Sequence, residues 1–179
     1  MKKHSLTLVL GGASSGKSEF AEKLATRLGR RILYLATALE NTTAVHTEEW
    51  REKIDRHRRR RPSHWQTEIL NGRPPRKILT GLNPHGILLD SLTLWISSRF
   101  QKISHESVDR SFLDILDSLR TRAPIIVVSD EVGLGLVPLS KTGRKFLDIL
   151  GRVNAGVARE AKTVFFVVSG QAIRIKPAS

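Results

Sequence analysis

Residues 11–18 carry the residue types that bind phosphate. They match the pattern G-x-x-x-x-G-K-[ST], directly after an apolar run and directly before a helical pattern. Glycines let backbone N–H groups approach phosphate oxygens closely, and the start of a helix adds a partial positive charge. The pattern therefore predicts a nucleoside triphosphate site in the loop Gly11, Gly12, Ala13, Ser14, Ser15, Gly16, Lys17 and Ser18.

Two side chains of this loop have predicted chemical roles. Lys17 is expected to neutralise charge on the β- and γ-phosphates, and the Ser18 hydroxyl to ligate Mg²⁺. A second carboxylate should help to hold the metal ion, and Asp90, at the end of the apolar run 87–89, is the natural candidate. Asp130 and Glu131 follow another apolar run and compete for the same role.

His57 lies inside a run of arginines at positions 56 and 58–61. Neighbouring guanidinium groups disfavour the imidazolium form, so a neutral imidazole with a nitrogen lone pair is expected. Beside cations that can grip a triphosphate, this nitrogen could attack phosphorus and form a phosphoramidate. The alternative interpretations are a solvated basic helix end or a nucleic-acid patch, since runs of charge usually are such features.

The elements that must position these groups follow from hydrophobic patterning. Nearly continuous apolar runs at residues 6–10, 32–36, 87–89, 125–128 and 164–168 are typical of parallel strands buried on both faces. Helical spacing follows Lys17 up to Gly29, and recurs near residues 112–119 and 140–161. This alternation predicts an α/β fold with a mainly parallel central sheet flanked by helices. Residues 37–68 and 71–86 break the rhythm and are expected to be irregular insertions near the site.

Composition limits the remaining possibilities. The 179 residues predict one domain, and the absence of cysteine excludes zinc-ribbon, iron–sulfur, thiol-nucleophile and disulfide-framework proteins. It also fits the reducing cytoplasm, which is the expected location. Residues 1–10 are expected to form a strand and not a signal peptide, and no stretch is apolar for long enough to span a membrane. The net charge of +13 points to nucleic acid, an anionic membrane or phosphorylated small molecules.

Several motifs make the chain similar to a known family, from residue 8 to residue 176. The chain resembles the bifunctional adenosylcobinamide kinase/adenosylcobinamide-phosphate guanylyltransferases of cobalamin assembly. Besides the phosphate loop, the shared motifs are Tyr34-Leu35-Ala36-Thr37-Ala38, Ile54-x-x-His57-x-x-x-Arg61-Pro62-x-x-Trp65-x-Thr67, Leu89-Asp90-Ser91-Leu92-Thr93-Leu94-Trp95, Glu131-Val132-Gly133-x-Gly135-x-Val137-Pro138, Gly151-Arg152-Val153-Asn154 and Val168-Ser169-Gly170.

The resemblance implies a RecA-like P-loop enzyme with two activities. It would phosphorylate adenosylcobinamide with ATP or GTP, and then transfer GMP from GTP through a histidine adduct to give adenosylcobinamide-GDP and pyrophosphate. His57 stands at the position of the guanylylated histidine, and the family is typically homotrimeric. Asp130 stands where Asn is commoner, and Glu68 lies one residue before the usual Glu position. The implied nucleotide contacts beyond the phosphate loop are Ala36, Thr37, Ala38, Arg58, Arg59, Arg60, Arg61, Glu68 and Asp90.

Two other functions remain open at this point. One is a different P-loop small-molecule kinase that forms no histidine adduct. The other is a RecA-like ATPase stimulated by nucleic acid, which the spread-out basic charge and the 6% aromatic content make the weaker alternative. No nucleic-acid partner is therefore expected.

Overall fold

The computed structural model describes residues 3–37, 48–70, 74–100 and 108–176, and the side chains at 49–51, 53, 54, 57, 76 and 109 lie outside the description. Within these ranges seven strands form one sheet in the order β3-β2-β4-β5-β1-β6-β7. All neighbouring strands are parallel except β6 and β7. The strands are β1 (Leu6–Gly11), β2 (Ile32–Ala36), β3 (Gln66–Ile69), β4 (Gly86–Asp90), β5 (Ile125–Asp130), β6 (Thr163–Val168) and β7 (Gln171–Lys176).

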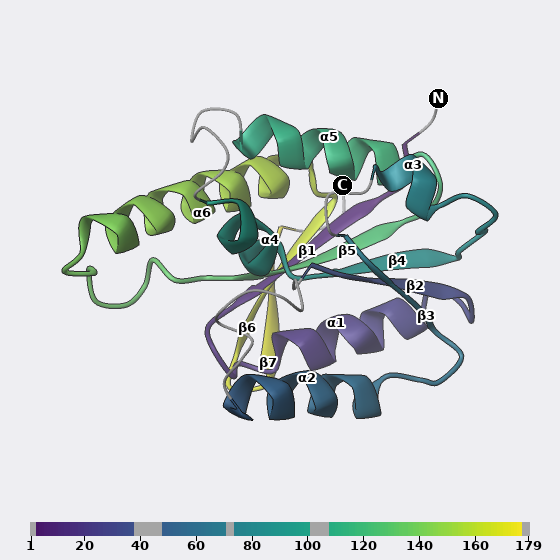
Figure 1. Ribbon diagram of the computed structural model, residues 1–179, viewed down its shortest axis with the longest axis horizontal. Coiled ribbons are helices and arrows are strands. Elements are labelled where there is room, and N and C mark those ends of the chain that lie inside the picture. The colour runs from purple at the N-terminus through teal and green to yellow at the C-terminus, as the bar shows by residue number, and fades with distance from the viewer. Residues whose placement is uncertain (1–2, 38–47, 71–73, 101–107, 177–179) are drawn as a thin grey trace.

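Helices cover both faces of this sheet (Figure 1). One face carries α1 and, outside it, α2, while the other face carries the remaining described helices. Among these, α5 and α6 pack against each other above β5 and β1. The described helices are α1 (Lys17–Thr26), α2 (Glu48–Arg60), α3 (Pro75–Ile78), α4 (Leu92–Arg99), α5 (Val108–Arg120) and α6 (Lys141–Glu160). None of them is long and apolar enough to cross a membrane.

Each face of the sheet has its own hydrophobic core. Trp95 of α4 and Phe112 of α5 are fully buried in the core beneath α4, α5 and α6, with ring centroids 5.0 Å apart. The core beneath α1 includes Tyr34 and Trp65. The central strands β1, β2, β4 and β5 are buried almost throughout, as expected for parallel strands covered on both faces. Burial on both sides fixes where each strand ends, and therefore where the side chains after it lie.

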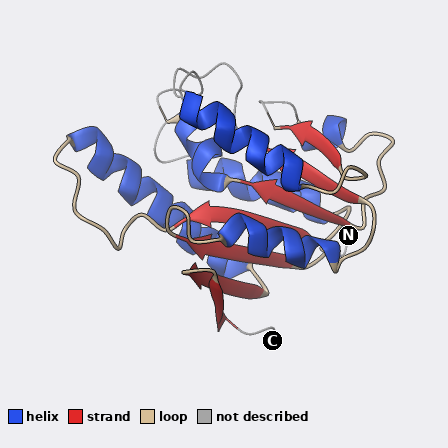
Figure 2. Cartoon of the chain, turned by 90° about the horizontal axis from the view of Figure 1, so that it is seen from below, coloured by secondary structure: helices blue, strands red, loops and turns tan. Residues whose placement is uncertain are grey.

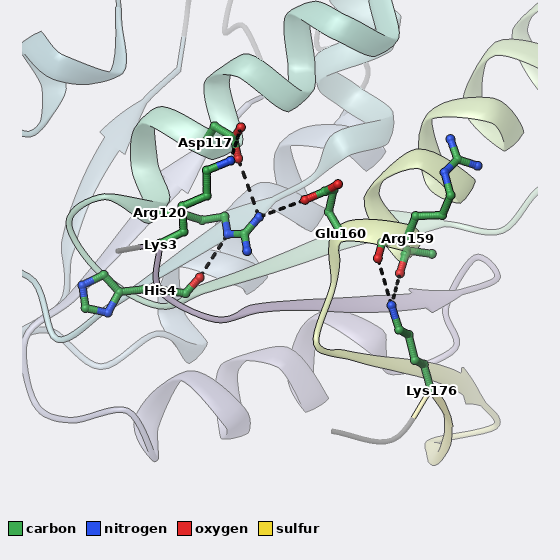
Figure 3. Close-up of polar contacts among 8 residues, drawn as sticks. Lys3, His4, Asp117, Arg120, Arg159, Glu160 and Lys176 are labelled. Carbon is green, nitrogen blue, oxygen red and sulfur yellow. Dashed lines mark hydrogen bonds and ion pairs between the residues drawn. The ribbon is translucent and has the colours of Figure 1, made fainter. Parts of the chain in front are cut away.

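Ion pairs occupy the edge of the sheet where β1 begins (Figure 3). The Arg120 guanidinium lies 3.6 Å from Asp117 and 3.5 Å from Glu160, and its Nε donates to the His4 carbonyl. Lys3 pairs with Asp117 at 2.7 Å. These contacts join the start of β1 to the ends of α5 and α6.

The segment between β5 and α6 extends away from the sheet. Figures 1 and 2 both show this loop and the first half of α6 projecting beyond the layered body. The loop is rich in apolar side chains that point into solvent, and Leu136 and Leu139 are 97% and 99% exposed. Exposed apolar groups gathered in this way mark surfaces that bind other molecules.

The structure confirms the predicted α/β class and every predicted strand, with ends shifted by no more than two residues. The expectation that residues 37–68 and 71–86 are irregular is wrong for much of their described part, because they contain α2, most of β3, and α3. The charged α2 has only two apolar residues in its sequence, Trp50 and Ile54, to reveal it, and β3 is a four-residue edge strand. Strand β7 also went unpredicted, because it is largely exposed and lacks the apolar run of a buried strand.

Candidate functional site

The polar ends of the central strands meet at one edge of the sheet. Gly11, where the phosphate loop begins, pairs with Asp130 of β5, and Asp90 of β4 pairs with Ala36 of β2. Asp90 also lies beside Val128, so β5 separates Asp90 from the phosphate loop. The loop and its two candidate carboxylates are therefore brought together by strand register, at the carboxyl ends where α/β proteins bind ligands.

The backbone of the phosphate loop requires glycine at two positions. A Cβ atom at Gly11 would lie 2.5 Å from the Ser15 hydroxyl and 2.6 Å from the Val167 carbonyl oxygen, too close for any side chain. Gly16 has a φ of 89°, in the left-handed region, and directly precedes α1. Ser18 lies in the first turn of that helix, half-buried. The N-terminus of α1 is thus presented at the loop, as phosphate binding requires.

The turn between β6 and β7 supports the loop from one side. The Gly170 N–H donates to the Ser15 carbonyl at 2.9 Å, and a Cβ at Gly16 would lie 3.3 Å from the Gly170 Cα. Ser169 and Gly170 both have positive φ, which makes this turn tight. The sequence analysis noted these residues only as a shared motif, and their contact with the phosphate loop is a finding of the structure.

The ammonium group of Lys17 is held by the protein itself. Its Nζ lies 2.6 Å from a carboxylate oxygen of Asp130 and donates to the Gly12 carbonyl at 3.0 Å. Lys17 is largely buried and Asp130 is partly buried, so water screens this ion pair less than it screens a surface pair. A bound triphosphate would therefore compete with Asp130 for the lysine.

Replacing Asp130 with asparagine is expected to tighten binding of GTP in the absence of divalent cations by about 3- to 10-fold. The amide carries no charge, so it competes less for Lys17 and repels the triphosphate less. Isothermal titration with EDTA present would measure the dissociation constant. Asp117→Asn, which removes a carboxylate from an ion pair at the opposite edge, is the matched control and should bind GTP as the wild type does. Weaker binding by Asp130→Asn would contradict this interpretation of the ion pair.

A polar network holds the end of β5 in place. The Asp130 N–H donates to Thr93 Oγ1 at 2.8 Å, and the Asp130 carbonyl accepts from Asn154 Nδ2 at 3.1 Å. Asn154 Oδ1 in turn accepts from the buried Ser129 hydroxyl at 2.7 Å. Residues of α4 and α6 therefore fix the backbone that carries Asp130, and the shared motifs containing Thr93 and Asn154 acquire a structural reason.

Asp90 is oriented by a buried tyrosine. The Tyr34 hydroxyl donates to Asp90 Oδ2 at 2.8 Å, and the Arg61 guanidinium stacks 3.9 Å from the centre of the Tyr34 ring. Burial, together with the neighbouring Asp90 carboxylate, raises the pKa of Tyr34 well above its ordinary value, so Tyr34 stays a donor at neutral pH. A carboxylate held in this way is pre-oriented to act as a metal ligand.

Thr37 follows β2 and is fully buried. Its hydroxyl donates to the Ser91 carbonyl at 2.6 Å and accepts from the Ser91 N–H at 2.8 Å. The Thr37 side chain thus joins the end of β2 to the residue after Asp90. A nucleotide contact at Thr37, and at Ala36 before it, stays a prediction, and Ala38 lies outside the described residues.

The arginines predicted to hold the nucleotide differ in the groups that they contact. Arg58 and Arg59 are exposed near the end of α2, and Arg61 donates to Thr67 Oγ1 at 3.2 Å. Arg60 points toward α1 instead, where its guanidinium donates twice to Glu22. Arg60 therefore has a different partner from the nucleotide that the sequence led us to expect. The backbone of His57 belongs to α2, and its side chain lies outside the described residues.

Two further glutamates from the sequence analysis have local partners. The Glu131 carboxylate accepts from the Gly133 N–H at 2.7 Å, which places it on its own loop. Glu68 accepts from Gln66 at 3.4 Å on the edge strand β3. Neither residue is shown to contact a metal ion or a nucleotide, and their roles stay predictions.

Comparison with known proteins gives consistent results across nearly the whole chain. The profile of the family described as cobinamide kinase / cobinamide phosphate guanyltransferase matches residues 7–175. The bifunctional adenosylcobalamin biosynthesis protein CobP of Pseudomonas aeruginosa is 34% identical over 177 residues, which cover 94% of this chain and 96% of that protein. The bifunctional adenosylcobalamin biosynthesis protein CobU of Escherichia coli K12 is 32% identical over 186 residues, with coverage of 96% and 99%.

One similar solved structure is that of the KaiC-like protein PH0186 from Pyrococcus horikoshii OT3. It has a TM-score of 0.49 and 15% identity, covering 93% of this chain and 72% of that chain. The family relationship depends instead on the sequences, which match over almost their full length and above 30% identity. The chain belongs to the cobinamide kinase / cobinamide phosphate guanyltransferase family.

Proposed function

We propose that the protein phosphorylates adenosylcobinamide and then converts the product to adenosylcobinamide-GDP. The observation that carries the proposal is the meeting of the phosphate loop with Asp90 and Asp130 at one sheet edge, in a chain whose relatives are named bifunctional. Both reactions break a phosphoanhydride bond, so one triphosphate site can serve both. The nucleotides are cytoplasmic substrates, which supports a cytoplasmic location.

In the kinase reaction, the substrate hydroxyl attacks the γ-phosphorus of ATP or GTP. The bond between the γ-phosphorus and its bridging oxygen breaks, the nucleoside diphosphate leaves, and the hydroxyl proton is released. Lys17 would move from Asp130 to the β- and γ-phosphate oxygens, where it offsets the charge of the leaving group. The backbone N–H groups of residues 11–18 would hold the phosphates in line.

In the second reaction, a nitrogen of His57 attacks the α-phosphorus of GTP and pyrophosphate leaves. The substrate phosphate oxygen then attacks the same phosphorus, the nitrogen–phosphorus bond breaks, and a diphosphate forms while the imidazole is regenerated. Arg58, Arg59 and Arg61 would stabilise charge on the phosphate oxygens. Guanine and ribose contacts would come from residues 36–38 and Glu68.

Mg²⁺ fits the groups at this edge. It prefers oxygen ligands and usually binds through one or two protein side chains together with substrate phosphates. Ser18 offers a hydroxyl in the first turn of α1, and Asp90 offers a carboxylate oriented by Tyr34. When bound, the ion would neutralise negative charge on the phosphate oxygens of the nucleotide. We propose Ser18 and Asp90 as its protein ligands.

Incubation with α-labelled GTP tests the proposal directly. The wild-type protein is expected to take up label in an acid-labile, base-stable form, as a phosphoramidate requires. Adding adenosylcobinamide phosphate should release that label into a product that carries GMP. GTP labelled at the γ-phosphate should label adenosylcobinamide but not the protein. A protein that phosphorylates adenosylcobinamide yet never takes up the α-label would be a P-loop kinase of another kind.

We also propose that the protein assembles as a homotrimer, with the loop between β5 and α6 buried between subunits. The support is the exposure of Leu134, Leu136, Val137 and Leu139 on a loop that projects from the body, because a monomer would leave these side chains in water. The loop begins directly after Asp130, so an assembly that buries it would lie next to the phosphate site.

Replacing Leu136 and Leu139 together with aspartate is expected to shift the protein from a trimer to a monomer of 20.0 kDa. Two charges cannot be buried in an apolar interface without partners. Sedimentation velocity would measure the mass of each form. Asn83→Asp adds charge at an exposed position near the opposite edge and should leave the assembly unchanged. A double variant that sediments with the wild type would remove this loop from the interface.

A further inference from the structure

A partly buried ion pair joins the helix that carries His57 to the helix that begins at the phosphate loop. Arg60, near the end of α2, donates from Nε to Glu22 Oε2 at 2.7 Å and from Nη2 to Glu22 Oε1 at 3.0 Å. Glu22 lies on α1, five residues after Lys17, and is only 7% exposed. Both carboxylate oxygens are used, which is the two-bond geometry in which an arginine and a carboxylate fix each other's orientation.

Because Glu22 is buried, its carboxylate depends on the hydrogen bonds from Arg60. A carboxylate that has left water needs its partner, and removing one member of such a pair leaves an uncompensated charge. The hydrogen bonds that Arg60 donates to Glu22 raise the pKa of Arg60 above its ordinary value. Arg60 is thus tied to α1, and like Arg58 and Arg59 on the same helix it stays partly exposed.

A second contact holds the chain just beyond α2. Arg61 stacks on Tyr34 and donates to Thr67, so it contacts β2 and β3. Tyr34 in turn donates to Asp90. Adjacent arginines therefore tie the end of α2 to the phosphate-loop helix on one side and to the Asp90 strand region on the other. Figure 1 shows α2 outside α1, and these contacts attach its end to the layers beneath.

We propose that Arg60 is a positioning residue and not a nucleotide ligand: through Glu22 it sets the place of α2, and so of His57, relative to the phosphate loop. The inference builds on the proposed function, since it concerns the adduct formed at His57. Positions 57 and 60 are less than one helical turn apart, so a shift of Arg60 moves His57 with it. A displacement of about 1 Å can slow an aligned reaction by about 100-fold.

A double-mutant cycle separates this role from direct phosphate binding. The variants are Glu22→Gln, Arg60→Gln and the double variant, with Asp117→Asn as the matched control. Asp117 also loses a carboxylate from an ion pair, but it pairs with Lys3 at 2.7 Å at the opposite edge of the sheet. Two rates are measured for each protein: uptake of label from α-labelled GTP, and phosphorylation of adenosylcobinamide. Hydrogen exchange of the backbone amides of residues 51–60 is measured in parallel.

Each single variant is expected to take up the α-label about 10- to 100-fold more slowly, while the kinase rate stays within about threefold of wild type. Because the pair acts as a unit, the double variant should be within about threefold of the slower single variant. Exchange in α2 should rise in all three, and Asp117→Asn should match the wild type. Losses that multiply in the double variant would overturn the proposal, since they would mean that Arg60 acts on the nucleotide by itself. A parallel fall of both rates would also overturn it.

Failure of the proposed function gives a different result. If the wild type takes up no α-label, the histidine adduct is wrong, and the exchange measurement still shows whether the pair holds α2. Glu22→Asp keeps the charge, shortens the side chain by one methylene, and serves if the neutral variants do not fold. It is expected to slow label uptake by about 3- to 10-fold with the kinase rate unchanged. A wild-type rate of label uptake in Glu22→Asp would overturn the proposal.

Discussion

The His57→Ala variant is expected to take up no label from α-labelled GTP, while its phosphorylation of adenosylcobinamide stays within about threefold of wild type. The imidazole nitrogen is the proposed nucleophile at the α-phosphorus, and alanine offers nothing in its place. The kinase reaction occurs at the γ-phosphorus and needs the phosphate loop, Lys17 and the metal ion, none of which depends on His57. The two activities should therefore separate in this variant.

The control for this experiment is His4→Ala. His4 is exposed near the start of β1, where its backbone carbonyl accepts from Arg120, and its removal should leave both activities intact (Figure 3). Acid-labile, base-stable label on His57→Ala would assign the adduct to another residue. Loss of both activities in a folded His57→Ala protein would instead mean that α2 takes part in both reactions.

The Lys17→Ala variant is expected to lose both activities by about 1,000-fold or more, because removing a single donor to the transition-state charge already costs about 100- to 1,000-fold. Here the loss is compounded. The variant would leave the Asp130 carboxylate beside the triphosphate without the cation that now neutralises it at 2.6 Å. Initial rates of γ-phosphate transfer and of α-label uptake would measure the two losses.

Lys23→Ala is the matched control for the phosphate-loop lysine. Lys23 lies on the same helix, is exposed, and pairs with Glu19 at 3.0 Å, so both rates should match the wild type. Kinase turnover that survives in Lys17→Ala would show that the two reactions do not share one phosphate loop. Thermal unfolding of both variants would confirm that each is folded.

The sequence predicted those parts of the fold in which local pattern and burial agree. The central strands are buried on both faces, so their apolar runs stand out, and the phosphate loop has a fixed spacing that only glycine can satisfy at Gly11 and Gly16. Helix α2 escaped prediction because its sequence is almost entirely charged and has too few apolar residues to indicate a buried face. Strand β7 escaped because it lies at an edge and is exposed.

The candidate site likewise has features that could be predicted and features that could not. The candidate carboxylates could be predicted because they end strands, and the ends of parallel strands meet. The contact partner of each side chain could not be predicted from the sequence. Lys17 contacts Asp130 through a pairing of β1 with β5, more than 100 residues apart in sequence, and Arg60 meets Glu22 across two helices. Such pairs are set by tertiary packing, which no short motif encodes.

The place of β1 in the sheet has a consequence for the order in which the protein can be made. The strand that leads into the phosphate loop is synthesised first, but it pairs with β5 and β6, which come from the last third of the chain. The loop also needs Gly170, whose N–H donates a hydrogen bond to the Ser15 carbonyl. On a ribosome, residues 6–18 would therefore emerge long before either neighbouring strand exists. The triphosphate site can reach its final form only after residue 170 has been made, so shortened chains ending before β6 would lack it.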